Sequence, residues 1–339
     1  MQTYAPLVFV DNIKNFFYDT NLSTDIFEDI TKLDYLERAL DLKYTTYEGG
    51  NIRDEKYSNV INSLRKYVSK KYNINQLDRM DELYVEAYLI SAFIASAWRK
   101  NKISYKIDKE LLSQFYSMDI PKELSAQFML KQPSNSYYLD ISEYGDEILK
   151  GAHGMFISTK EIEEYIIIRI ILYAPGIYKG DTTILHLRVN KNKQELTIPK
   201  FKTESCEDLD GLKLYKVLLN FMVYLHASNK DVEISERTRQ NHTKKDSNVI
   251  KDKFREVKEF SVGLRYGNEV RKNKVRYKYI GESESTGEHR KVTSHYRAAH
   301  WHRYWVGTGD NKELVPKWIE GVFVKGSVES DDIVIHKVK

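Results

Sequence analysis

Apolar positions follow a helical period in the first third of the chain. Between Gln76 and Lys100 they recur at alternating steps of three and four, which places them on one stripe of a predicted helix. We interpret the aromatic side chains of this stripe, such as Trp98, as core packing. A shorter helix is predicted from Glu110 to Met118, because Pro121 follows shortly after it. The pattern therefore predicts a helical N-terminal region over residues 1–130.

The pattern changes to strands in the next hundred residues. The run from Tyr165 to Tyr173 is β-branched and apolar at nearly every position, which is typical of a strand that is buried on both faces. Partner strands are predicted over Thr183–Val189 and Gln194–Ile198. The apolar period becomes helical again from Asp208 to Ala227, and we expect this helix to pack on the sheet. These elements define an α+β core over residues 131–228.

The last third of the chain is polar at first and strand-like afterwards. Residues 229–258 contain no large apolar run, so they are predicted to form a basic polar linker or loop. Residues 259–339 form a basic, aromatic, β-rich region with strand-like pieces at Phe260–Tyr266, Lys274–Ile280, Lys291–Trp305 and Leu314–Val324. The predicted fold class is α+β: a helical N-terminal part, then a mixed sheet with a packed helix, and a basic C-terminal β segment.

The positive charge is concentrated in one part of the sequence. The whole chain has 53 lysine and arginine residues, 49 acidic residues and a formal net charge of +4. Residues 237–303 contain 18 of the basic residues and 8 of the acidic ones, an excess of ten positive charges. The rest of the chain is therefore acidic overall. A basic segment of this kind favours a polyanionic partner, or it is a solvated surface.

The composition is that of a soluble globular protein. Of the 339 residues, 41% are hydrophobic and 30% are charged, which excludes a disordered, collagen-like or coiled-coil chain. The longest apolar run, from Tyr165 to Pro175, is interrupted by Arg169 and falls short of the roughly 20 residues of a membrane helix. The lone cysteine, Cys206, fits a reducing compartment. We expect a cytoplasmic protein with no membrane partner.

The most unusual stretch lies near the C-terminus, where three of the four tryptophans fall between positions 301 and 318. A strand here would place alternate residues on opposite faces. One face would carry His300, His302 and Tyr304, and the other would carry Trp301, Arg303 and Trp305. Interleaved aromatic and cationic side chains favour a nucleic-acid surface, where the rings stack on bases and the cations contact phosphates. The alternative is an aromatic core with satisfied histidines.

Metal and catalytic interpretations of this stretch have weaker support. A His-x-His pair can hold a metal, but the stretch offers no cysteine or carboxylate as a third ligand, so no metal or cofactor is predicted. The chain lacks a phosphate-binding glycine loop, a His-Glu-x-x-His pattern and a Gly-x-Ser-x-Gly motif, which argues against an enzyme. A metal-independent ribonuclease that uses His300 and His302 as general acid and base stays the alternative enzyme.

Arg169 is a separate candidate. It is the one charged residue in the apolar run from Tyr165 to Tyr173. An unpaired charge in such a strand would cost several kcal/mol on burial. Arg169 is therefore paired with an internal carboxylate, or it points into a binding cavity.

The C-terminal stretch resembles the signature of a known family. The residues that carry the resemblance are His300-Trp-His-Arg-Tyr-Trp-Val-Gly307, with Arg297 before them and Lys317-Trp318-Ile319 and Val322-Phe-Val324 after them. The family consists of mobile-element proteins and includes the type V-A anti-CRISPR inhibitors that suppress production of the effector nuclease. The resemblance implies a protein that recognises the nascent N-terminal peptide of this nuclease in a bacterial host, after which the encoding mRNA is lost.

An extended peptide is bound most readily at a sheet edge or in an aromatic-lined groove. Trp301, Trp305 and Trp318 are candidates for the pockets of such a site. The ribosome and the mRNA are further candidate partners, and an RNA-binding or RNA-cleaving protein is the alternative function. The candidate peptide-binding or nucleic-acid-binding residues are Arg169, Arg297, His300, Trp301, His302, Arg303, Tyr304, Trp305, Lys317 and Trp318.

Overall fold

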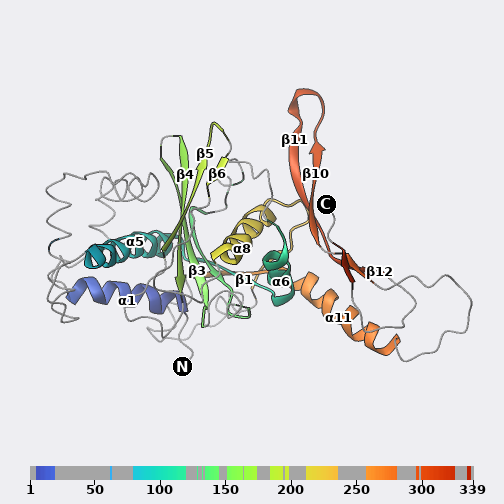
Figure 1. Cartoon of the computed structure of the whole chain (residues 1–339), viewed down its shortest axis with the longest axis horizontal. Helices are drawn as coiled ribbons and strands as arrows, with labels where there is room; N and C mark the ends of the chain where they lie inside the picture. Colours follow the sequence, from blue (N-terminus) through green and yellow to red (C-terminus); the bar gives the residue numbers. More distant parts are fainter. Residues whose placement is uncertain are drawn as a thin grey trace, which may run out of the picture. The chain divides into compact units, whose positions relative to one another are not determined.

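A computed structural model of the chain confirms the predicted α+β class (Figure 1). It describes residues 5–19, 62, 79–119, 128, 132, 134–144, 151–162, 164–173, 184–193, 195–197, 211–235, 257–280, 295–297, 299–324 and 334–336. Most of the predicted linker and Cys206 lie outside these residues. The described chain forms two compact units. Unit 1 contains residues 1–106, 124–209 and 234–260, and unit 2 contains residues 107–123, 210–233 and 261–339.

The described part of the chain contains both helices and strands. The helices are α1 (Ala5–Asp19), α5 (Arg79–Asn101), α6 (Lys109–Ser117), α8 (Gly211–Tyr224) and α11 (Leu264–Ile280), with a short 3₁₀ helix η2 (Gly309–Asn311). The strands before residue 200 are β1 (Ile103–Ile107), β2 (Ser136–Asp140), β3 (Gly154–Ile162), β4 (Tyr165–Tyr173), β5 (Ile184–Asn190) and β6 (Glu195–Thr197). The later strands are β7 (Val232–Ile234), β8 (Lys258–Val262), β9 (His295–Arg297), β10 (His300–Val306), β11 (Glu313–Ile319), β12 (Val322–Val324) and β13 (Val334–His336).

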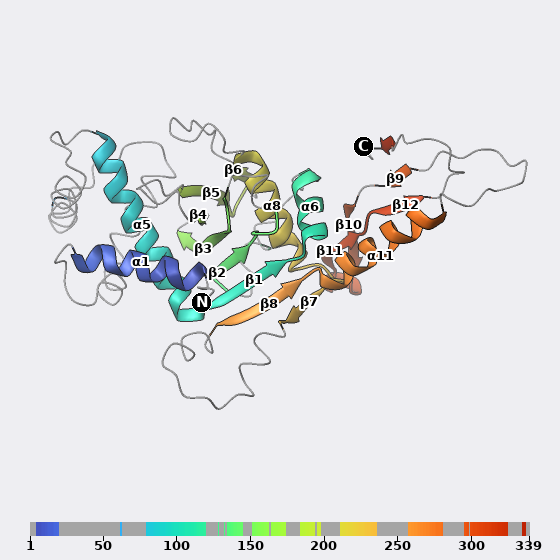
Figure 2. The same ribbon diagram turned by 90° about the horizontal axis from the view of Figure 1, so that it is seen from below.

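The large sheet has eight strands in the order β6-β5-β4-β3-β2-β1-β8-β7 (Figure 2). The pairs from β2 to β6 are antiparallel, and β1 pairs with β2 in parallel. The apolar run from Tyr165 to Tyr173 forms β4, a central strand whose residues after Tyr165 are all buried. Its two neighbours, β3 and β5, give β4 a full set of ladder hydrogen bonds. The predicted central strand is therefore confirmed.

The core of unit 1 is aromatic on the sheet face that carries Phe156. Phe9 of α1 stacks on the Phe156 ring with centroids 4.4 Å apart, and Trp98 of α5 meets the same ring edge-on at 5.8 Å. The Trp98 side chain is fully buried, and its indole N–H donates to the carbonyl of Ile103 at 2.8 Å. Helices α1 and α5 also contact each other (Figure 2). Trp98 is thus a core residue, as the helical stripe predicts.

A buried polar row crosses the same sheet. Ser158, Arg169 and His186 are register partners on β3, β4 and β5, and all three are at most 9% exposed. Burial, together with the charge of Arg169, lowers the pKa of His186 to about 3. The imidazole is therefore neutral at physiological pH. The row belongs to unit 1, where it lies on the face of the sheet that carries Phe156.

Unit 2 is built around the apolar helix α8, whose buried side chains include Leu218, Phe221 and Met222. Helix α6 packs against α8. Strands β10 and β11 form a two-stranded sheet of their own, and β12, β9 and β13 form a three-stranded sheet. The helix predicted from Asp208 to Ala227 is confirmed as α8.

The strand predictions in this region are wrong in part. The stretch from Lys274 to Ile280 and the last three residues of Phe260–Tyr266 are predicted as strand but belong to helix α11. The helix begins after Gly263, and the Asp231 carboxylate accepts the backbone N–H groups of Arg265 and Tyr266 in its first turn. This tertiary cap favours the helix over the local strand preference. In the N-terminal region predicted to be helical, strand β1 follows α5 directly.

None of the helices in the described residues combines the length and the apolar character that a membrane crossing requires. The regions bounded at residues 130, 228 and 258 remain a prediction from the sequence pattern.

Candidate functional site

The tryptophan- and histidine-rich stretch forms an antiparallel hairpin, β10–β11 (Figure 1). The register joins His300 to Ile319 at the base and Val306 to Glu313 near the turn. Gly307 has a φ of 109°, and a Cβ there would lie 2.2 Å from the carbonyl oxygen of Asn311, so the turn needs a glycine at this position. Because residues 300–306 form a strand, their side chains alternate between two faces, as the sequence predicts.

The base of the hairpin is part of the core of unit 2. Trp318 is only 2% exposed, and its ring meets Phe115, Tyr224 and Tyr266 edge-on at 5.6, 5.9 and 6.4 Å. Trp301 is its register partner, with ring centroids 5.1 Å apart. The core interpretation of the aromatic stretch therefore holds for its base.

One asparagine fixes the base of the hairpin to helix α8. Asn220 is fully buried, and its carboxamide oxygen accepts the indole N–H of Trp301 at 2.9 Å. Its amide nitrogen donates to the carbonyl of Phe115 at 3.2 Å. Both ends of the carboxamide are thus used, which offsets the cost of burying it.

The outer edge of β11 is closed by neighbouring groups. The Asn229 side chain accepts the backbone N–H of Trp318 and donates to the carbonyl of Trp318, at 3.0 and 2.8 Å. The backbone N–H of Ser228 donates to the carbonyl of Pro316 at 3.1 Å, and a proline has no N–H of its own. These backbone groups of β11 point away from β10 and are already hydrogen-bonded to Asn229 and Ser228. A further strand therefore cannot pair with this part of the edge.

Strand β10 has a strand partner on one side within the described part of the chain. The backbone groups of Trp318 point away from β10, so the pair Trp301–Trp318 is one of the non-hydrogen-bonded pairs of the hairpin. By alternation, Trp305 occupies an equivalent position on β10, with its backbone groups directed to the outer edge. This edge has the geometry that strand addition requires.

The outer half of the hairpin exposes large side chains. Tyr304 is 42% exposed and Trp305 is 69% exposed, on opposite faces of β10. The His302 ring lies against the Tyr304 ring, with centroids 4.4 Å apart. The Lys317 ammonium lies 5.5 Å from the Tyr304 ring centre. An aromatic and cationic surface therefore lies beyond the buried base.

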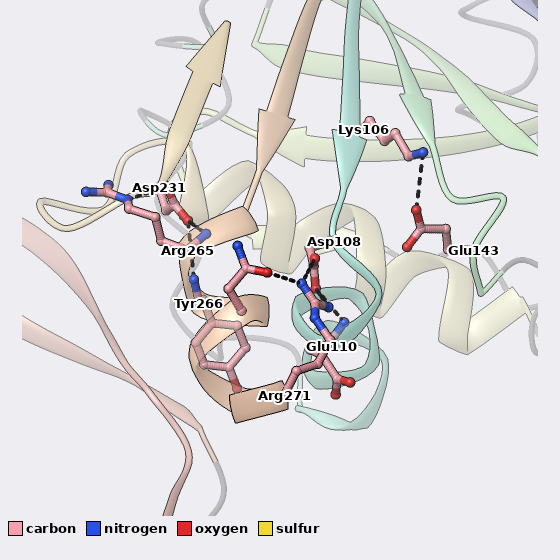
Figure 3. A network of polar contacts seen from close by, with 9 residues as sticks. Lys106, Asp108, Glu110, Glu143, Asp231, Arg265, Tyr266 and Arg271 are labelled. Carbon is pink, nitrogen blue, oxygen red and sulfur yellow. Dashed lines mark hydrogen bonds and ion pairs between the residues drawn. The ribbon is translucent and has the colours of Figure 1, made fainter. Parts of the chain in front are cut away.

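Two buried carboxylates organise the helices of unit 2 (Figure 3). Asp108 caps α6, because its carboxylate accepts a hydrogen bond from the backbone N–H of Glu110. The same carboxylate accepts hydrogen bonds from both terminal NH₂ groups of Arg271, at 3.0 and 2.8 Å. Asp231 accepts the backbone N–H and the Nε–H of Arg265 at 2.7 and 2.8 Å. Helix α11 is therefore held at its first turn and again nearly two turns later.

The structure brings eight of the ten predicted site residues together in the hairpin: His300, Trp301, His302, Arg303, Tyr304, Trp305, Lys317 and Trp318. Arg297 lies on β9 in the three-stranded sheet and is exposed. Arg169 lies in unit 1. Sequence reasoning missed Asn220 and Asn229, because each contacts a residue more than 80 positions away and neither belongs to a motif. Among the described residues, no three His, Cys, Asp or Glu side chains gather as metal ligands.

Comparison with known proteins identifies the family. Residues 105–326, about two thirds of the chain, match the model of the AcrVA2-like family, anti-CRISPR type V subtype A2, and the chain belongs to this family. A crystal structure of AcrVA2 aligns with a TM-score of 0.52 at 16% identity, covering 96% of this chain and 100% of that one. At this identity the likeness shows a shared fold. A comparison with curated proteins gives no significant match.

Proposed function

We propose that this protein recognises the nascent N-terminal peptide of a type V-A CRISPR effector nuclease and lowers its expression through loss of the encoding mRNA. Membership of the anti-CRISPR family supports a CRISPR-related target. The recognition of a nascent peptide follows from the resemblance of the C-terminal signature. The protein acts as a binding module in a bacterial host, and the mRNA is degraded by host ribonucleases.

The observation that carries the proposal is the asymmetry between the two edges of the hairpin. Asn229, Ser228 and Pro316 close the edge of β11, whereas β10 pairs only with β11 in the described chain. An extended peptide adds to β10 as a third strand, so that main-chain hydrogen bonds supply the affinity. The added strand pairs with the backbone groups of Trp305 that are directed to the outer edge, while the Trp301 ring stays in the core of unit 2.

Substitution of Trp305 with proline or alanine tests this mode of binding. Both variants lose the indole, but only Trp305→Pro loses the N–H directed to the outer edge. We expect Trp305→Pro to bind a synthetic N-terminal peptide of a type V-A effector roughly fivefold more weakly than Trp305→Ala, the effect of about 1 kcal/mol for one hydrogen bond. Calorimetric titration measures both dissociation constants.

The closed edge of the hairpin provides the control. Pro316→Ala restores an N–H on β11, where the segment at Ser228 and Asn229 already occupies the edge. We expect this variant to bind the peptide as the wild-type protein does. Equal affinities for Trp305→Pro and Trp305→Ala, with both variants folded by circular dichroism, would exclude strand addition at β10.

A further inference from the structure

The outer half of the hairpin has more exposed aromatic surface than an edge-bound peptide uses. Tyr304 and Trp305 lie on opposite faces, while strand addition takes place at the edge between the faces. We propose that these two faces bind single-stranded RNA. That the strand is RNA rests on the proposed function, because the messenger is the single-stranded polymer next to a nascent chain.

The first face combines a ring with a cation. The Tyr304 ring is partly covered by His302 at 4.4 Å, and the Lys317 ammonium lies 5.5 Å from its centre. His302 and Lys317 are register partners, so the three side chains form one patch. A base stacks on the exposed part of the Tyr304 ring, and the Lys317 ammonium contacts the adjacent phosphate.

The second face repeats the combination. Trp305 is the most exposed large apolar side chain of the described residues, at 69%. Arg303 lies two positions before it on the same face and is exposed. A guanidinium on the same face as an indole brings positive charge near a stacking surface. Each face therefore combines an exposed ring with a basic residue.

The charge of the surroundings favours a polyanion over a protein. The Lys317 ammonium lies beside the exposed Tyr304 ring, whereas lysine is depleted in protein–protein interfaces. The hairpin contains Arg303, Lys312 and Lys317 against Asp310 and Glu313, and the two acids lie toward the turn. A base in a duplex is already stacked, which leaves single strands as the ligand.

Fluorescence anisotropy with a fluorescein-labelled, unstructured RNA of mixed sequence tests the proposal. We expect wild-type binding that weakens steeply with salt. Tyr304→Ala and Trp305→Ala should each weaken binding by at least about fivefold, the effect of losing one stacked base. Lys317→Gln should weaken binding and reduce the salt slope, and Lys317→Arg should restore both.

Matched variants separate stacking from apolar docking. Tyr304→Phe keeps the ring and should bind like the wild type, whereas Tyr304→Leu keeps apolar area without a ring and should bind as weakly as Tyr304→Ala. Leu212→Ala, at a 55% exposed position of α8, should have no effect. Absence of wild-type RNA binding would overturn the proposal. Wild-type RNA affinity in Tyr304→Leu would overturn it too, because apolar area without a ring would then be sufficient.

Peptide binding by the same variants distinguishes the two proposals. Tyr304 lies at a position where its backbone groups face β11, so Tyr304→Ala leaves the outer edge of β10 intact. We expect Tyr304→Ala to weaken RNA binding and to retain peptide binding. The difference in peptide affinity between Trp305→Pro and Trp305→Ala reports only on the backbone N–H at the outer edge of β10, because both variants lack the indole. Either proposal can therefore fail while the other stands.

Discussion

At the scale of single residues, buried polar side chains have different roles in the two units. Asn220 satisfies two partners at once, the indole of Trp301 and the carbonyl of Phe115, so it fixes the base of the hairpin. His186 is held neutral by burial beside Arg169. Asn220 therefore stabilises the protein through its hydrogen bonds, whereas His186 makes the stability of the protein depend on pH.

The pKa of His186, lowered to about 3, predicts that acid destabilises the protein through this residue. An unfolded histidine has a pKa of about 6.5, so the unfolded state binds a proton that the native state excludes. The contribution of neutral His186 is complete above pH 6.5 and is lost as the pH falls from 6.5 toward 3. We expect up to about 1.4 kcal/mol of lost stability per pH unit in this window.

His186→Gln provides the comparison, because glutamine does not titrate. The free energy of unfolding in urea, measured from pH 7.5 to pH 5, should fall less steeply for the variant than for the wild type. Proton titration of the His186 ring by NMR gives an independent reading. Identical slopes, or a ring that titrates near pH 6.5, would contradict the prediction.

At the scale of elements, a tertiary contact of α11 reverses the effect on stability that a glycine-to-alanine substitution usually has in a helix. Gly267 lies in the second turn of the helix, where alanine is ordinarily favoured by about 0.8–1.0 kcal/mol. A Cβ at this position would lie 2.0 Å from an Asp108 carboxylate oxygen. That carboxylate cannot move freely, because Glu110 and Arg271 both hold it.

We therefore predict that Gly267→Ala destabilises the protein, by about 1–3 kcal/mol, against the usual helical preference. Thermal or urea unfolding measures the change. In an Asp108→Ala background the collision is absent, and Gly267→Ala should then be stabilising. A stabilising Gly267→Ala in the wild-type protein would show that α6 and α11 shift apart at no cost.

The hairpin shows how far an element can be predicted. The alternation of His300, His302 and Tyr304 with Trp301, Arg303 and Trp305 follows from the period of a strand. The pattern could not separate the buried base from the exposed outer half, because Trp318 and Trp305 have the same chemistry in sequence. Their burial depends on α6 and α8, which supply Phe115 and Tyr224 to the base.

At the scale of the whole molecule, the fold places an aromatic hairpin on an α+β protein of the anti-CRISPR type V subtype A2 family. Under the proposed function, the protein meets its target on the ribosome. The relevant observable is therefore the messenger that co-purifies with the protein while the nascent chain is attached.

We predict that the protein, purified from a lysate translating a type V-A effector, is enriched in the effector mRNA over other transcripts, and that puromycin removes this enrichment. Puromycin detaches the nascent chain, so a link through the peptide is broken. A transcript with the N-terminal codons replaced should not be enriched. Enrichment of the effector mRNA that is unchanged by puromycin would contradict recognition of the nascent peptide.

The sequence by itself determined the α+β class, the central strand β4, the helices α5, α6 and α8, and the strand of the aromatic stretch. These features depend on local periodicity, which a single chain segment displays without its partners. The tertiary structure decided that Lys274–Ile280 is helical, that Trp318 is core, and that one edge of the hairpin is closed. Each of these depends on contacts between distant residues, such as Asp231 with Arg265 or Asn229 with Trp318, which local pattern does not encode.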